Sequence, residues 1–536
     1  MKKIFIASIY LALGTSGLLL TSCRSTDTES NLVSGAPTAV SFNLTDTEFS
    51  NGTAAAQASV DGKGAVITES SVQKQTTMID PSTAIVAELS PASGNIKSSS
   101  QASVGKASLA AVPGSALGAG IQFRVIAYNQ ADGSFQAFQD YTVGQQAVPM
   151  MLNVGATYTM VVYSYGTITL PAVTSGEKTN INNAQVNYDD ANRDFMYYNQ
   201  SNYIPVKGSN VLNITLRHKV AQITTIINSN GMGNIASVAN AVLTPHYSNG
   251  TIPLSSGVMT GRSTLTTGVP LQFSNTTSTT SVAAPVFINA DTGGNKTGSF
   301  SADITLGSTT KNLVNTFKIT PGYKSNLTIN INKCGAMVNG VWRVFSCHNM
   351  GADATADPFT PAAAIHGAKY QWGAKTGEAG KYVSQADDQS MTSVSGWNNT
   401  TNPDNSLWGN TTKGPNDPCP SGYRVPAQSE WAAVFNENTG TRVGNWGVFG
   451  TTTYGSAYYI SSASKPNSLM LPAAGYRGNG LILTRGQEAV YWSGTPSSTL
   501  IGLSLRIDQF TVTSETTFNA GNSKTNGLSV RCISEN

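Results

Sequence analysis

The five cysteines carry the clearest chemical information in this chain. One stands alone at Cys23, and the others are Cys334, Cys347, Cys419 and Cys532. No two have the Cys-x-x-Cys spacing of zinc sites and redox pairs, so we expect neither. In an exported protein, an even number of cysteines is normally paired, and four cysteines allow three connectivities.

A turn signal favours one of these connectivities. Cys334 and Cys347 flank Asn339-Gly340, which lies between β-favouring residues and predicts a two-residue hairpin turn. Counting outward from that turn places Cys334 opposite Phe345, two residues from Cys347. We therefore expect a local Cys334–Cys347 disulfide, which leaves Cys419 and Cys532 to form the second one.

Histidine and serine patterns give no sign of catalysis. The four histidines are widely separated and have no metal-ligand spacing: His218, His246, His348 and His366. His218 shares the apolar face of a predicted strand, where a hydrogen-bonded core histidine is the expected role. No Gly-x-Ser-x-Gly motif is present. We expect no catalytic residue, no metal and no cofactor, and hence no enzyme.

The tryptophans pose a sharper question, because all seven lie beyond residue 332. Trp342, Trp431 and Trp492 stand in apolar or alternating contexts and are expected in the core. The candidates for ligand binding stand among Asn, Gly and Thr residues: Trp397, Trp408 and Trp446. Each either packs inward, which we favour, or stacks on a sugar or protein partner.

Oxygen-bearing side chains in the same region raise the possibility of calcium. Asn398, Asn399, Asp404 and Asn405 could supply oxygen ligands from a flexible loop. Loops rich in Asn, Asp and Gly are more often simple turns, which is the reading we favour.

Composition excludes nucleic acid as a partner. The chain has 32 Lys and Arg against 29 Asp and Glu, and no Lys/Arg run exceeds two residues. Only 11% of residues are charged, while Ser, Thr, Asn and Gly are abundant. This polar but uncharged composition is typical of exported all-β proteins.

The sequence of the N-terminus predicts an export signal. Lys2 and Lys3 precede an apolar stretch over residues 4–20, which ends directly at Leu20-Thr-Ser-Cys23. These last four residues resemble a bacterial lipobox. The resemblance implies a signal peptide over 1–22, a lipid on Cys23 and a tether over 23–34. We therefore expect the protein to be anchored to the outer membrane through its N-terminal lipid and displayed at the cell surface. An ordinary secretion signal with a chance cysteine is the alternative.

Short alternating runs between turn residues predict β-sandwiches from residue 35 to about 331. Val40–Leu44 alternates, Gly120–Tyr128 and Thr157–Tyr165 are expected to pair, and Leu212–Val220 presents one apolar face. The polar segment Pro171–Asn187 suggests a boundary, giving sandwiches over 35–172 and 173–331.

Three segments in this region carry a family resemblance: the aromatic 157–165 strand, Asp194-Phe-Met-Tyr-Tyr198, and Leu-Arg-His-Lys-Val-Ala-Gln-Ile over 216–223. Their texture resembles the fimbrillin-like lipoproteins of Bacteroidota. The resemblance implies two tandem transthyretin-like β-sandwiches, with fimbrial subunits as candidate partners.

Residues 332–536 resemble a second family, the Fibrobacter succinogenes major paralogous domain, which is similar to C-type-lectin-like and formylglycine-generating-enzyme folds. Its motifs here are Asp417-Pro-Cys-Pro-Ser-Gly-Tyr-Arg-Val-Pro426, Ser429-Glu-Trp-Ala-Ala-Val-Phe435, Leu471-Pro-Ala-Ala-Gly-Tyr-Arg477, Tyr491-Trp-Ser-Gly494 and Gly527-Leu-Ser-Val-Arg-Cys-Ile533. The resemblance implies an irregular α+β domain. The close cysteine pair that binds copper in the enzymes is missing.

One helix is predicted in this last domain. Trp431, Val434 and Phe435 have helical spacing, which places a helix over about 428–438. Ala427 stands where Ser or Thr would complete a capping box with Glu430.

The expected fold is therefore mainly β: two sandwiches followed by an irregular lectin-like domain. The expected function is a surface adhesin or ligand-binding protein, with a host or environmental glycan or protein as ligand. A fimbrial tip or anchor accessory subunit is the first alternative, and an enzyme on the C-terminal fold is the second.

Overall fold

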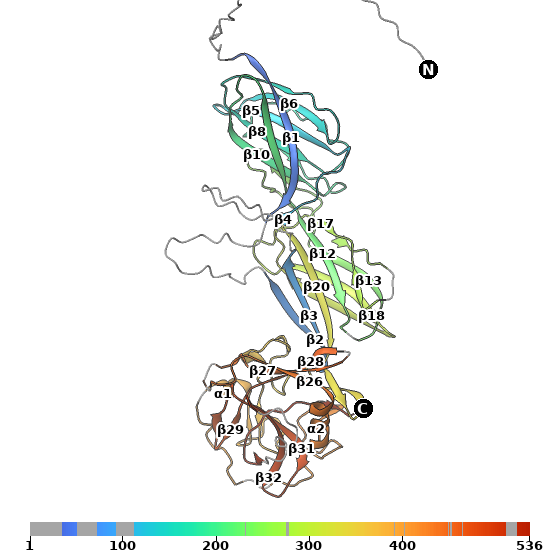
Figure 1. Ribbon diagram of the computed structural model, residues 1–536, viewed down its shortest axis with the longest axis vertical. Coiled ribbons are helices and arrows are strands. Elements are labelled where there is room, and N and C mark those ends of the chain that lie inside the picture. Colours follow the sequence, from blue (N-terminus) through green and yellow to red (C-terminus); the bar gives the residue numbers. More distant parts are fainter. Residues whose placement is uncertain are drawn as a thin grey trace, which may run out of the picture.

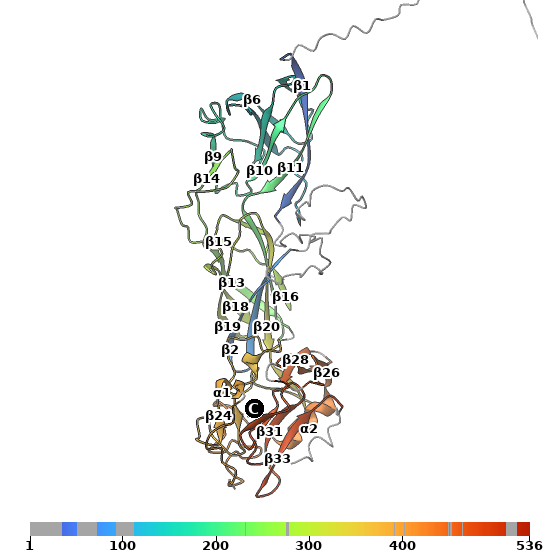
Figure 2. The same cartoon turned by 90° about the vertical axis from the view of Figure 1, so that its left-hand side faces the viewer.

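The computed structural model describes residues 35–50, 72–92, 112–230, 232–274, 278–390, 392–400, 403–448, 450, 453–463, 465–510 and 522–535. Cys23, the signal segment and the tether lie outside these residues. The described chain forms three bodies in a row, with β1 beginning at one end of the rod and the last body at the other (Figures 1 and 2). It is mainly β, as predicted from composition and strand spacing.

The first body is built on one eight-stranded sheet, in which β7 pairs with β1 beside the order β4-β1-β11-β10-β8-β5-β6. Each predicted strand of this body is present, and β5 pairs with β8 as expected. Its strands are β1 (Pro37–Phe49), β4 (Val112–Pro113), β5 (Gln122–Asn129), β6 (Phe135–Thr142), β7 (Met150–Asn153), β8 (Tyr158–Ser164), β10 (Met196–Tyr203) and β11 (Asn210–His218).

Both faces of the centre of this sheet are covered, so every residue of β8 is buried. One side packs the core that contains Val40, Val125 and Ile214. On the other side lies a short pair, β9 (Gln185–Asn187) and β14 (Thr251–Pro253), whose Val186 and Ile252 belong to a second core (Figure 2).

The boundary predicted between residues 172 and 173 does not match the strand pairing. The polar segment after Pro171 lies against the first body, where the carboxylate of Glu177 accepts a hydrogen bond from Tyr163 at 2.6 Å. Arg124 donates to the Pro171 carbonyl at 2.9 Å. The segment resembles a linker in composition, but its Glu177 satisfies buried polar groups of the first sheet. The strands β10 and β11, predicted in the second sandwich, therefore belong to the first.

The second body is a sandwich of a six-stranded and a four-stranded sheet around one aliphatic core. The first sheet has the order β16-β12-β20-β3-β2 with β17 beside β12, and the second has the order β15-β13-β18-β19. The strands are β2 (Gln73–Asp80), β3 (Thr83–Pro91), β12 (Ala221–Asn228), β13 (Ile235–Thr244), β15 (Val269–Pro270), β16 (Thr280–Val282), β17 (Val286–Ile288), β18 (Gly298–Leu306), β19 (Thr309–Phe317) and β20 (Lys324–Lys333).

The chain thus enters the second body twice. The β2–β3 hairpin, which precedes β12 by more than 100 residues in the sequence, pairs with β20 of the second body. This pairing contradicts the predicted assignment of residues 35–172 to one sandwich. Pairing between segments some 240 residues apart leaves no local pattern in the sequence, because a strand records its own alternation and not its partner.

The third body consists of short strands and helices, as the irregular α+β prediction requires. Its elements are β21 (Gly335–Val338), β22 (Val341–Val344), η1 (Ala363–Ile365), β23 (Lys369–Tyr370), β24 (Tyr382–Val383), α1 (Gln385–Gln389), β25 (Tyr423–Arg424), α2 (Gln428–Glu437), β26 (Thr439–Val443), β27 (Ala457–Ser462), β28 (Lys465–Pro472), β29 (Tyr476–Gly478), β30 (Leu481–Leu483), β31 (Ala489–Pro496), β32 (Ile501–Ile507), β33 (Asn522–Ser523) and β34 (Ile533–Ser534).

The predicted hairpin and helix are both present in this body. Asn339 and Gly340 have φ of 53° and 73°, as a type I′ turn requires, and Val338 pairs with Val341. The helix α2 starts after Ala427, which offers no side-chain cap. The Glu430 carboxylate supplies the other half of the box by accepting from the Ala427 amide at 2.8 Å.

The turn between β2 and β3 joins the second body to the third. The Cys347 amide donates a hydrogen bond to the Pro81 carbonyl, and the Cys334 amide donates one to the Ser82 carbonyl, both at 2.8 Å. Tyr423 donates to the Ser82 hydroxyl at 2.9 Å. These backbone bonds fix the third body on the end of the sandwich.

Candidate functional site

Both predicted disulfides are present. Cys334 and Cys347 are joined across the base of the hairpin, and Cys419 is joined to Cys532 over a separation of 113 residues. All four are buried and lie in the cores of the third body. Their position in the cores indicates that the two disulfides have a structural role.

The structure places the three candidate binding tryptophans inside the third body. Trp397 is 8% exposed, Trp408 1% and Trp446 5%. Each indole N–H donates to a backbone carbonyl: the acceptors are Thr525 for Trp397 at 3.0 Å, Ala374 for Trp408 at 3.0 Å and Val443 for Trp446 at 2.8 Å. The rings are buried and the N–H groups are occupied, which supports the packing interpretation that we favour.

Trp342 is the opposite case. Its alternating context predicted a core position, as for Trp431 and Trp492, but the ring is only partly buried. Lys465 lies over the ring at 3.9 Å from its centroid, a cation–π contact. The strand β22 forms only a two-stranded sheet with β21, which explains why alternation there does not bury the ring.

The oxygen-bearing side chains near Trp397 form hydrogen-bonded turns. Asn398 accepts from the Thr400 amide at 2.9 Å, and Asp404 from the Ser406 amide at 2.9 Å. The ammonium group of Lys524 donates to Asn405 at 2.5 Å, which places a cation where calcium would need an oxygen. Within the described residues no group of three or more His, Cys, Asp or Glu side chains could hold a metal.

The histidines also serve packing. His218 is buried, and its Nδ1 lies 2.5 Å from Asp194. Its ring stacks on Phe49 with centroids 3.8 Å apart, which confirms the core role predicted for it. His246 lies 2.6 Å from Asp190 and accepts from the Asn289 amide at 3.0 Å.

A buried charge cluster, which the sequence did not reveal, lies at the centre of the third body. Asp388, 1% exposed, contacts Lys369 at 3.3 Å, Arg477 at 2.8 Å and Arg485 at 3.2 Å. Burial alone would raise the pKa of Asp388, but the three cations together outweigh it and hold that pKa below its usual value. Arg477 also donates to several backbone carbonyls, including that of Gly480 at 2.7 Å. The four side chains of the cluster are each 1% exposed or less, and the cluster holds loops together.

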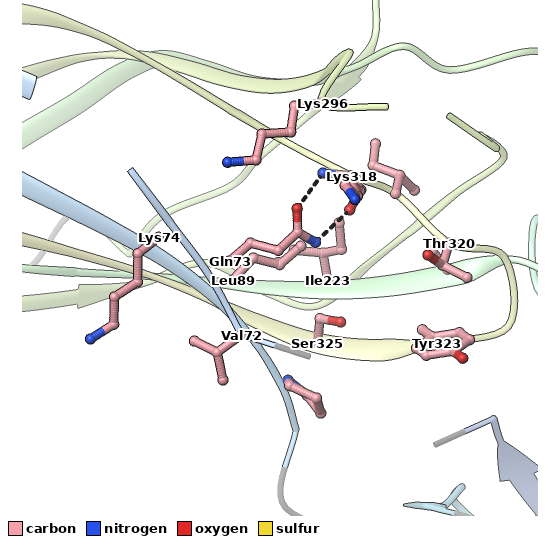
Figure 3. Close-up of a pocket in the computed structure, with 13 residues that line it drawn as sticks. Val72, Gln73, Lys74, Leu89, Ile223, Lys296, Lys318, Thr320, Tyr323 and Ser325 are labelled. Carbon is pink, nitrogen blue, oxygen red and sulfur yellow. Dashed lines mark hydrogen bonds between the residues drawn. The ribbon is translucent and has the colours of Figure 1, made fainter. Parts of the chain in front are cut away.

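A cavity lies at the edge of the second body, and we call it the lysine cleft. It has a volume of about 410 Å³, within the range of small-molecule sites. Lys74, Lys296 and Lys318 line it, together with Tyr323 and smaller side chains (Figure 3). No aspartate or glutamate is among the described residues that line it, so its charge is positive.

Glutamine side chains close the sandwich next to this cleft. Gln73 on β2 accepts from the Lys318 amide at 2.6 Å and donates to the Lys318 carbonyl at 3.1 Å (Figure 3). Gln75 accepts from the Thr316 amide at 2.6 Å. These side-chain hydrogen bonds connect the edges of the two sheets, where no backbone strand pairing in the described chain joins β2 to β19. Gln73 also lines the cleft, so its bonds to Lys318 hold one edge of the cleft in place.

The lysines of the cleft differ in their ion pairing. Lys74 lies 3.4 Å from Glu88, whereas among the described residues neither Lys296 nor Lys318 forms an ion pair. All three are exposed. Sequence analysis missed the cleft because its lining comes from five separate segments of the chain and contains no motif.

Comparisons with known proteins give distant likenesses only. No protein-family model matches the chain, and a search of the curated proteins found no match. A proposed cell adhesion protein of Bacteroides fragilis is 11% identical over 57% of this chain and 95% of its own, with a TM-score of 0.29. The fimbrial anchor protein Mfa2 of Porphyromonas gingivalis is 10% identical over 43% of this chain and 93% of its own, with a TM-score of 0.26.

The tip fimbrial protein Mfa3 of the same organism is 10% identical over 36% of this chain and 75% of its own, with a TM-score of 0.25. At these identities and TM-scores the likenesses carry no conclusion about this chain. Among the described residues, no helix is long and apolar enough to cross a membrane.

Proposed function

We propose that the protein is a lipid-anchored adhesin of the cell surface that binds an acidic glycan in the lysine cleft. The observation that carries the proposal is a cleft of about 410 Å³ with three lysines and no carboxylate in its described lining. Ammonium groups suit the sulfate or carboxylate groups of an acidic sugar. Tyr323, Thr320 and Ser325 add a ring and hydroxyl groups of the kind that contact sugar hydroxyls.

The rod shape supports display at a surface. The described chain begins at Gly35, just before β1, and β1 starts at the end of the rod opposite the third body (Figure 1). A lipid on Cys23 would lie twelve residues before Gly35, and twelve extended residues reach at most about 40 Å. In this arrangement the first body stands next to the outer membrane, and the lysine cleft lies farther out.

The third body has a different role in this proposal. The candidate binding tryptophans Trp397, Trp408 and Trp446 are buried, so these three rings do not form the aromatic platform expected for a lectin-like head. Its disulfides and its bonds to Pro81 and Ser82 make it a rigid cap on the sandwich that forms the cleft.

A glycan array with the full chain tests the binding claim. We use the Cys23→Ser form so that no lipid is attached, and compare Lys318→Glu with Lys375→Glu, an exposed lysine of the third body with the same charge change. Sulfated or uronic-acid glycans should bind, and Lys318→Glu alone should weaken binding by about tenfold or more, as for loss of a hydrogen bond to a charged group. Equal binding of neutral glycans, or equal loss in both variants, would contradict the proposal.

Two further assays separate the anchor and the fimbrial alternative. Cys23→Ala should move the protein from the detergent phase to the aqueous phase, and unchanged partitioning would exclude the lipid. A concentration-dependent ladder of polymers from purified protein would favour a fimbrial subunit over a stand-alone adhesin.

A further inference from the structure

A second cavity lies at the other end of the sandwich, beside the third body, and we call it the Lys311 cavity. Its volume is about 330 Å³. Seven apolar side chains line it, and the polar lining residues are Asp80, Thr83, Thr309, Lys311 and Lys333. The apolar lining residues are Ile79, Ile85, Met232, Ile304, Leu306, Leu313 and Ile331.

The floor of this cavity is the end of the sandwich core. Ile85, Ile304, Leu313 and Ile331 are each 3% exposed or less and belong to the main aliphatic cluster. Leu306 and Ile79 are only partly buried and pack against that cluster. An apolar ligand entering here would therefore contact side chains that the fold already holds in place.

Two lysines occupy strand positions that face the core. On β19, Leu313, Asn315 and Phe317 are buried at alternate positions, and continuing the alternation backwards places Lys311 on that same face. On β20, the buried residues Leu327, Ile329 and Ile331 place Lys333 likewise. Core-facing strand positions are normally apolar, and these two lysines stand at the end of the core, where Lys311 is exposed and Lys333 is partly buried.

The structure accounts for only one of these cations. Lys333 lies 3.5 Å from the carboxylate of Asp80 and donates to Thr83 at 2.9 Å. Among the described residues, Lys311 has no ion pair. One positive charge therefore remains over an apolar cavity, because Asp80 and Lys333 neutralise each other.

We propose that the Lys311 cavity binds an alkyl carboxylate, with the chain on the aliphatic floor and the carboxylate at Lys311. A divalent cation is disfavoured by the two lysines, and an alkyl ammonium group would meet the charge of Lys311. An uncharged hydrocarbon would leave Lys311 without an anion. The proposal is independent of the glycan proposed for the lysine cleft.

Calorimetric titration of the full Cys23→Ser chain with hexanoate, octanoate and decanoate, below micelle formation, tests this site. Affinity should rise by roughly fourfold per added methylene until the cavity is full. Methyl decanoate and decylammonium should bind at least tenfold more weakly than decanoate, because each lacks the negative charge.

Two variants locate the site. Lys311→Gln, at an exposed position, should weaken decanoate binding by about tenfold, and Leu306→Trp should abolish it by filling the cavity. The control is Lys296→Gln in the lysine cleft, which should bind decanoate as the parent does. An unchanged thermal midpoint shows that each variant is folded.

Three results would overturn the proposal. They are no decanoate binding by the parent, equal binding by Leu306→Trp, and loss of binding in Lys296→Gln but not in Lys311→Gln. Binding to phosphatidylcholine vesicles with no binding of free decanoate would overturn it as well.

Discussion

The buried imidazole of His366 makes the stability of the third body depend on pH. The side chain is 1% exposed, and its ring lies against Tyr454 with centroids 5.0 Å apart. Burial, together with the nearby cations Lys369 and Arg485, lowers the pKa of His366 from 6.5 to about 3. The folded form therefore keeps a neutral ring at pH 4, while the unfolded chain takes up a proton below about pH 6.5.

The direction and size of the effect follow from these two pKa values. Between pH 6.5 and about 3 the unfolded state binds more protons, so the free energy of unfolding falls as the pH is lowered through this window. At pH 4 the loss from His366 relative to pH 7 is about 3 kcal/mol, since each pKa unit corresponds to about 1.4 kcal/mol.

Urea unfolding followed by tryptophan fluorescence measures this loss. All seven tryptophans lie beyond residue 332, so the signal of the full chain reports the third body alone. The matched variant is His366→Phe, which keeps an aromatic ring beside Tyr454 and removes the titration. The carboxylates are common to both proteins, so the difference between their pH profiles isolates His366.

We expect the parent to lose about 3 kcal/mol more than His366→Phe between pH 7 and pH 4. Parallel profiles for the two proteins would refute the argument, because they would mean that the imidazole takes up its proton equally well in the folded state.

Four further predictions concern the third body and the lysine cleft. Asp388→Asn leaves three cations without their buried carboxylate and should cost about 3 to 5 kcal/mol in urea unfolding, whereas Asp387→Asn, its exposed neighbour, should cost less than about 1 kcal/mol. Replacing Cys419 and Cys532 by Ser should lower the free energy of unfolding by up to about 4 to 5 kcal/mol, since the bridge closes a loop of 113 residues; an unchanged midpoint would show that the bridge adds no stability. Trp408→Ala should destabilise by about 3 to 5 kcal/mol, because the ring is buried against Trp372 and Trp492, and a folded variant of parental stability would contradict its core role. Glycan binding in the lysine cleft should weaken as salt is raised from 50 to 500 mM, and salt-independent affinity would exclude an ionic contact.

Local signals in the sequence predicted local structure well. Asn339-Gly340 fixed the register of the hairpin and with it the Cys334–Cys347 pairing, because both depend on residues within a few positions of the turn. The spacing of Trp431, Val434 and Phe435 likewise placed α2 to within one residue.

Long-range pairing could not be predicted in the same way. The β2–β3 hairpin pairs with β20, although most of the strands of the first body lie between them in the sequence. The residue pattern of the hairpin would suit either sandwich. Trp397 and Trp446 lie among turn residues, which predict a loop but do not say whether its side chains point inward. The two cavities draw their residues from segments between 72 and 333, so neither leaves a motif.

A structure of the full chain bound to a sulfated oligosaccharide tests the adhesin proposal most directly. The proposal predicts the sulfate group in the lysine cleft, within hydrogen-bond distance of the ammonium groups of Lys296 and Lys318 and beside Tyr323. A ligand bound only to the third body, or an empty cleft at a saturating concentration of the sugar, would contradict it.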